Sequence, residues 1–178
     1  MTKDSTEIWI KTGYEIFALH GQSGLKIEPL AKKVGKSKSS FYHYFADLDL
    51  YIDSLLHYHI EQSYIIADKE HSAKNIDPEL ITILAEHRVD LLFNRQLRIH
   101  QNIPLFSDTL LHSNKIVGDA FVQAWVKDLG LQLSQKQLQG IVTLALENFF
   151  LQINADNLNH QWLSEYFVNL KKIADTFG

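Results

Sequence analysis

Residues 26–45 contain the densest set of side chains that could bind a charged ligand. Five of the chain's lysines lie in this stretch, interspersed with serines, a histidine and two tyrosines that donate or accept hydrogen bonds. Lysine ammonium groups contact phosphates, and lysine, serine and histidine also reach base edges in the major groove of DNA. The chemistry that this stretch predicts is therefore binding to nucleic acid.

The spacing of two small residues predicts how this stretch folds. In a helix-turn-helix motif, two helices cross through a tight turn so that the second can lie in the major groove. The crossing requires a small residue inside the first helix and a glycine four residues later, and Ala31 and Gly35 have that spacing. Apolar residues at i, i+3, i+4 and i+7 give the first helix one buried face: Ile27, Leu30, Ala31 and Val34. Lysines and paired aromatics alone are common on any helical surface or core, so the turn spacing decides in favour of DNA binding.

Residues 27–45 resemble the DNA-binding signature of the TetR family of bacterial transcriptional regulators. Their sequence is IEPLAKKVGKSKSSFYHYF, and the ending SFYHYF is the most specific part. The resemblance covers about residues 5–56, and beyond them only the helical pattern and the total length agree. It implies an all-α fold of about nine helices, with a three-helix helix-turn-helix DNA-binding domain at residues 1–47 and a larger helical domain for effector binding and dimerisation at residues 48–178.

The resemblance also implies roles for individual residues. On the second helix of the motif, base edges would be contacted by Lys38, Ser39, Ser40 and His43, and phosphates would be approached by Tyr42 and Tyr44. Further phosphate contacts would come from Lys26, Lys36 and also Lys33, whereas Phe41 and Phe45 would pack inward. The chemistry suits these roles, because lysine donates to guanine O6 and N7 and histidine can donate to or accept from a base.

Two positions depart from the family pattern. Many relatives begin the second helix with threonine, whose hydroxyl caps the helix and contacts a phosphate, whereas this chain has Lys26. Relatives often carry a lysine at the start of the fourth helix, whereas this chain has Leu48 between Asp47 and Asp49. One phosphate contact is therefore missing, and we expect weaker operator binding than in a lysine-bearing relative.

Helix start and stop residues predict the other elements. The first helix is expected at residues 5–20, Ser37 caps a third helix that reaches Phe45, and Asp47 caps a long fourth helix. The remaining expected helices cover residues 78–100, 113–129 and 134–153, with an interruption and restart at Pro104 and a last helix that opens at Asn159. The sequence contains no convincing strand, repeat or low-complexity segment.

Composition limits the class of protein. The 178 residues include no cysteine, which excludes a disulfide scaffold and a thiolate zinc site. The net charge is −4, yet residues 1–45 hold seven lysines against four acidic residues, so positive charge is concentrated where nucleic-acid binding is expected. The first residues do not read as a signal peptide and no apolar stretch has membrane-spanning length. We therefore expect a cytoplasmic protein without a membrane partner.

The last two helices are expected to form a homodimer. Residues 141–151 are apolar nearly all the way round, and the final helix carries a broad apolar stripe, so both need to be buried. The resemblance implies a four-helix bundle with the two-fold mates, and the candidate interface residues are Val142, Leu146, Phe150, Leu163, Phe167 and Leu170. Such a dimer would place two recognition helices about 34 Å apart, one turn of DNA. A closed monomeric core is the alternative.

A small-molecule site is implied for the helices between these two regions. The candidates for its lining are His87, Phe106, Phe121, Trp125, Asn148 and Phe149, and the aromatic content favours an apolar or aromatic effector of unknown identity. The same residues also fit an ordinary hydrophobic core, which any helical bundle needs.

The leading functional hypothesis is a repressor whose dimer leaves its operator when an effector shifts the fourth helix. Activation instead of repression, and control by a protein partner, stay open. An enzyme on an all-α scaffold is disfavoured, since no nucleophile–base, phosphate-loop or metal motif is recognised and no catalytic residue can be named. We expect neither a cofactor nor a metal, because no two of the nine histidines have the i, i+4 spacing of a helical zinc site.

Overall fold

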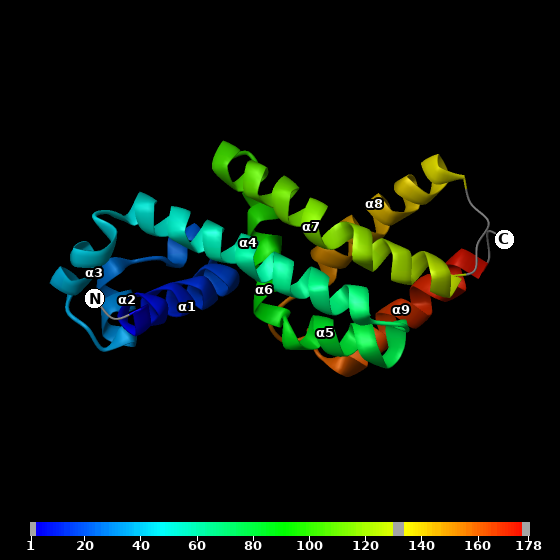
Figure 1. Cartoon of the computed structure of the whole chain (residues 1–178), viewed down its shortest axis with the longest axis horizontal. Coiled ribbons are helices and arrows are strands. Elements are labelled where there is room, and N and C mark those ends of the chain that lie inside the picture. The colour runs from blue at the N-terminus through cyan, green and yellow to red at the C-terminus, as the bar shows by residue number, and fades with distance from the viewer. Residues whose placement is uncertain (1–2, 130–133, 176–178) are drawn as a thin grey trace. The chain divides into compact units, whose positions relative to one another are not determined.

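The computed structural model describes residues 3–129 and 134–175, apart from the side chains of residues 3, 4, 119–129, 135, 138, 174 and 175. Within this range all regular elements are helical (Figure 1). The α-helices are α1 (Lys3–His20), α2 (Ile27–Val34), α3 (Lys38–Phe45), α4 (Leu48–Ser72), α5 (Ile81–Glu86), α6 (Arg88–Ile99), α7 (Pro104–Leu129), α8 (Gln135–Gln152) and α9 (His160–Asp175). Short turns η1 (Gln22–Gly24) and η2 (Ile76–Leu80) precede α2 and α5. The all-α fold class is confirmed.

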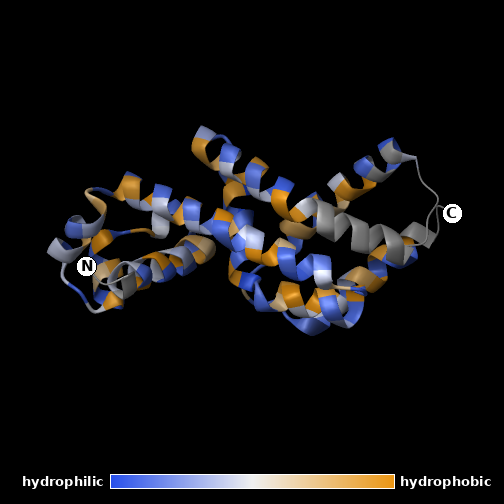
Figure 2. Cartoon of the chain, in the orientation of Figure 1, coloured by the Kyte–Doolittle hydropathy of each residue, from blue (hydrophilic) through white to orange (hydrophobic). Residues whose placement is uncertain are grey.

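Local side chains set the helix ends where the sequence predicts them. The expected caps Ser37 and Asp47 are confirmed, and Ser134 and Asn159 cap α8 and α9 in the same way. Each of the four side chains accepts a hydrogen bond from the backbone N–H three residues later. Figure 2 shows hydrophobic and hydrophilic residues alternating along the helices, as amphipathic helices require. No helix in the described part of the chain is long and apolar enough to cross a membrane.

The prediction of one helix at residues 78–100 is wrong, because this segment forms the three separate elements η2, α5 and α6. His87 separates α5 from α6 with φ −94° and ψ 25°, and Lys69 Nζ lies 2.9 Å from His87 Nε2. The break lets α5 pack against α9 while α6 packs with α1, so one sequence segment supplies two cores. The restart at Pro104 is confirmed, because α7 begins there. Proline suits the first helical position, since the N–H that it lacks would have no partner within the helix.

The described residues pack as two compact units. The first consists of Met1–Gln62 with Val89–Ser113, and the second of Ser63–Arg88 with Asn114–Gly178. We call them unit 1 and unit 2. The helices α4 and α7 each contribute to both, so packing places the first part of α4 and α6 from Val89 onward with the N-terminal helices. The expected division at residue 47 is a functional one and stays a prediction.

Each unit has an aromatic core. In unit 1, Phe17 of α1 stacks on Phe93 of α6 with ring centroids 4.4 Å apart, and Phe106 of α7 meets Phe17 edge-on at 5.5 Å. In unit 2, Phe149 of α8 packs edge-on against Tyr166 of α9 at 5.4 Å. Such pairs add about 0.5–1.5 kcal/mol each beyond the burial of their area.

Gly13 allows α1 and α4 to approach closely. Tyr51 of α4 is fully buried and donates its hydroxyl to the backbone carbonyl of Trp9 at 2.6 Å. A Cβ atom on Gly13 would overlap this hydroxyl, so the position accepts no larger residue unless Tyr51 moves.

We predict that Gly13→Ala lowers the free energy of unfolding by about 1–3 kcal/mol, the usual cost of overpacking a core. Urea denaturation measures this cost. Adding Tyr51→Phe should recover part of it, because the overlapping oxygen is removed. Gly118→Ala is the matched control, since a Cβ at this helical glycine meets no atom within 4 Å and alanine should stabilise the helix. Equal stability of Gly13→Ala and the parent chain would contradict the account.

Candidate nucleic-acid interface

The turn between α2 and α3 depends on Gly35. Its backbone has φ 71° and ψ 30°, the left-handed region that favours glycine. Its N–H donates to the carbonyl of Lys32 at 3.2 Å, and the next N–H, of Lys36, donates to Ala31 at 2.9 Å. A Cβ at Gly35 would meet no atom within 4 Å, so the backbone angle, and not lack of space, calls for glycine.

Buried aromatic residues fix the orientation of α3. Phe41 is fully buried and Phe45 is 6% exposed, which agrees with the expected inward packing. The ring of Phe41 meets Trp9 of α1 at 5.6 Å and Tyr51 of α4 at 5.1 Å, both edge-on. Because one side of α3 is held by α1 and α4, its opposite side is directed outward.

The outward side of α3 carries most of the expected contact residues. Of the expected contact residues along the chain, those that are exposed are Lys26, Lys36, Lys38, Ser39, Tyr42 and His43. Ser40 and Tyr44 are half-buried. Lys38, Ser39, Tyr42 and His43 share one face of the helix, because they lie one turn apart in pairs. We call this set the α3 outer face.

Two lysines of this region are paired with carboxylates. Lys38 Nζ lies 3.2 Å from Glu28 Oε1 of α2, and Lys33 Nζ lies 3.7 Å from Glu15 Oε2 of α1. All four side chains are at least half exposed, so both pairs are weak and can open when a phosphate or base competes. Glu28 therefore competes with an anionic ligand for the ammonium group of Lys38.

The two departures from the family pattern have structural counterparts. Lys26 is the N-cap of α2, and its side chain makes no capping hydrogen bond. Leu48 is the first residue of α4, and the neighbouring Asp47 carboxylate accepts the N–H of Leu50 at 2.8 Å. The start of α4 therefore presents no side-chain cation.

A buried polar cluster ties α1 to α4 and α6 inside unit 1. Tyr14 donates its hydroxyl to Asp90 Oδ1 at 2.8 Å and lies 2.7 Å from His59 Nδ1. Because the hydroxyl proton is used on Asp90, His59 Nδ1 must carry a proton and donate it to the Tyr14 oxygen. Phe93 stacks on both rings, 4.3 Å from Tyr14 and 4.7 Å from His59 between centroids.

Burial decides the charge of this cluster. It lowers the pKa of His59 to about 4, although the nearby Asp90 carboxylate acts in the opposite direction. Burial, followed by the effect of Asp90, raises the pKa of Tyr14 well above its ordinary value. The histidine and the tyrosine are therefore neutral at physiological pH.

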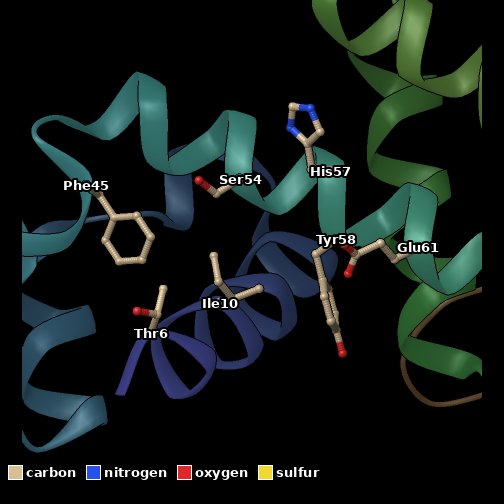
Figure 3. A pocket seen from close by; sticks show the side chains of 7 residues that line it. All are labelled: Thr6, Ile10, Phe45, Ser54, His57, Tyr58 and Glu61. Carbon is tan, nitrogen blue, oxygen red and sulfur yellow. The ribbon is translucent and has the colours of Figure 1, made fainter. Parts of the chain in front are cut away.

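A groove of about 430 Å³ lies between α1, the end of α3 and α4 (Figure 3). Its lining consists of Thr6, Ile10, Phe45, Ser54, His57, Tyr58 and Glu61. Burial raises the pKa of Tyr58, whose ring meets Tyr14 edge-on at 5.0 Å. The groove contains no lysine or arginine and so does not extend the basic surface of α2 and α3. Among the described residues, no three histidine, aspartate or glutamate side chains converge to hold a metal.

Comparison with known proteins agrees with this geometry. No protein-family model matches the sequence, and a search of curated proteins finds no match. Among solved structures, the chain is similar to a protein from Rhodococcus sp. assigned to the TetR family of transcriptional regulators, with a TM-score of 0.56 over 98% of both chains and 17% sequence identity. The chain has the TetR fold. At this identity the likeness concerns the fold, and function has to be argued from the site.

The residues expected to line an effector site fall in different parts of the TetR fold. His87 is buried beside Lys69, and Phe149 lies in the aromatic core of unit 2. Asn148 is exposed and accepts a hydrogen bond from Tyr166 at 3.3 Å. Phe106 belongs to the core of unit 1. The side chains of Phe121 and Trp125 lie outside the described residues.

The expected dimer residues are largely inside their own chain. Val142, Phe150, Leu163 and Phe167 are buried, and Leu146 and Leu170 are half-buried. The large apolar side chains that α8 and α9 expose are instead Ile141, Leu144, Leu151, Val168 and Ile173.

Sequence reasoning missed several residues that the packing makes important. Gly13, Tyr14, His59 and Asp90 gave no signal, because their roles depend on contacts between helices distant in sequence. Glu70 could have been noticed, since it continues the inward spacing of α4 and is 2% exposed.

We predict that acid destabilises the fold through His59. The unfolded chain protonates this histidine near pH 6.5, whereas the folded chain does so only near pH 4, so stability falls as the pH drops through this window. The loss should reach about 3 kcal/mol, at about 1.4 kcal/mol per pKa unit. His59→Asn keeps a donor for Tyr14 but cannot be protonated, and should lose less stability between pH 6.5 and 4 in urea titrations. An identical pH dependence in both proteins would rule out this role.

We also predict that Glu28→Gln strengthens DNA binding about three- to tenfold, because it frees Lys38 and removes a negative charge next to the phosphates. Fluorescence anisotropy with labelled duplex DNA measures the change. Glu7→Gln is the matched control, since it neutralises an exposed carboxylate paired with Lys11, which is not an expected DNA contact. A gain of equal size in the control would mean that net charge alone is responsible.

Proposed function

We propose that the chain is a DNA-binding transcriptional regulator that holds a two-fold symmetric operator as a homodimer. The observation that carries the proposal is the α3 outer face, whose lysine, serine, tyrosine and histidine side chains are exposed while Phe41 and Phe45 anchor the opposite side. The TetR fold adds support from the architecture.

The side chains of this face fit the chemistry of a major groove. Lys38 can donate to guanine O6 and N7, Ser39 can donate or accept, and His43 can do either according to its tautomer. Tyr42 is 46% exposed, so its hydroxyl is available to a phosphate oxygen.

Repression relieved by an effector is the mode of action that we propose. An effector that binds unit 2 would shift the equilibrium of α4, which belongs to both units, and so change the spacing of the two recognition helices. For a useful response the effector must prefer one state by about 1–3 kcal/mol. No enzymatic role is proposed.

Selection of bound fragments from the source genome tests the DNA-binding function. We expect an enriched motif with two half-sites about 10 base pairs apart, bound at least 10³-fold more tightly than shuffled DNA. Lys38→Ala should weaken binding to the motif about tenfold, whereas Lys171→Ala on α9 should leave it unchanged. Equal affinity for the enriched and shuffled sequences would refute the proposal.

The homodimer is proposed to form through the outward side of α8 and α9. Ile141, Leu144 and Leu151 share one face of α8, with spacings of three and ten residues, and are between 36% and 78% exposed. Val168 of α9 is 48% exposed. A second copy would remove these side chains from water, and two copies are needed to read two half-sites.

We predict that the double variant Leu144→Asp, Leu151→Asp sediments as a monomer at micromolar concentration, because two buried carboxylates would oppose the interface. The parent chain should sediment at twice the 20.5 kDa chain mass. Leu111→Asp is the control, since this leucine is 66% exposed on the part of α7 in unit 1 and should leave the dimer intact. A monomeric parent chain would refute the dimer.

A further inference from the structure

The second half of α4 carries an acidic residue on its inward side. Ser63, Ile66, Ala67 and Glu70 follow the spacing i, i+3, i+4 and i+7 and belong to unit 2. Their exposed fractions are 1%, 4%, 6% and 2%, so Glu70 is as deeply buried as its apolar neighbours. A carboxyl group at such a position requires an explanation.

Neither carboxyl oxygen of Glu70 has a hydrogen-bond partner among the described residues. The adjacent Lys69 does not supply one, because its ammonium group lies 3.1 Å from Glu86 Oε2 and 2.9 Å from His87 Nε2. An unpaired carboxylate in a protein interior is strongly unfavourable. Burial accordingly raises the pKa of Glu70 to about 8, so the group holds its proton at neutral pH.

Two inward-facing residues that precede Glu70 on α4 are small. Ala67 lies one turn before it and Ser63 two turns before it, beside the larger Ile66. These small residues lie on the same inward side of α4 as the buried carboxyl group without a donor among the described residues.

We infer that Glu70 anchors the positively charged group of the effector, so that the effector is an apolar or aromatic organic cation. This inference rests on the proposed ligand-responsive function. A cation is favoured over a neutral donor because its positive charge stabilises the ionised carboxylate, which burial alone disfavours. A metal ion is disfavoured, since within the described residues no group of three or more acidic or histidine side chains converges on one site.

The test uses the full chain and three matched pairs of probes of increasing size: 4-methylpyridine, 4-phenylpyridine and acridine, each compared with its N-methylated cation. At pH 8 the parent bases are neutral and the methylated forms are permanently charged. Isothermal titration calorimetry should give at least tenfold tighter binding of one cation than of its neutral partner. Glu70→Gln should abolish this preference, so that both members of the pair bind equally, and should leave the affinity for the neutral probe unchanged.

Asp68→Asn is the matched control, because it removes the same charge from an exposed position on the same helix. It should retain the full preference for the cation. Glu70→Asp keeps the charge, provides a second variant if Glu70→Gln folds poorly, and should retain part of the preference. The inference is overturned if no cation binds, if the parent chain binds both members of every pair equally, or if the preference survives in Glu70→Gln.

DNA binding is measured separately with the enriched fragment. Cation binding at Glu70 without specific DNA binding would refute the proposed regulator and leave the ligand site standing. Specific DNA binding without any cation preference would refute the ligand class and leave the regulator standing.

Discussion

The packing of Phe41 between Trp9 and Tyr51 is the constraint on which the candidate interface depends. A recognition helix of eight residues has too few hydrogen bonds to be stable alone, so its position is set by the helices that hold its inner side. Tyr51 in turn fits only because Gly13 has no side chain. The exposure of Lys38 and its neighbours on the α3 outer face is therefore a consequence of aromatic packing in α1 and α4.

Much of the fold could be predicted from the sequence because helix ends are local. Ser37 and Asp47 cap the helices that follow them, and the buried Ala31 and the left-handed Gly35 occupy the positions that the turn spacing requires. The break at His87 could not be predicted, since no glycine or proline marks it in the sequence. The expected dimer and effector residues could not be told from the chain's own core either, because an apolar stripe does not distinguish a core from an interface.

The buried polar groups of the two units differ in what they do for the protein. In unit 1, the hydrogen bonds of Tyr14 join His59 and Asp90, and the cluster stabilises the junction of three helices at neutral pH. In unit 2, Glu70 is buried without a donor among the described residues and lowers stability relative to a neutral side chain of the same shape. Hydrogen bonds between helices explain the first cluster, whereas the carboxyl group of Glu70 has no such bond in the described part of the chain, and for this reason we infer a ligand there.

The central claim is that the α3 outer face contacts DNA. Backbone NMR spectra of the full chain, recorded while the enriched duplex is added, test it most directly. We expect the largest chemical-shift changes in the amides of residues 36–44 and little change in those of α8. Shifts that leave residues 36–44 unchanged while the duplex is bound would contradict the account.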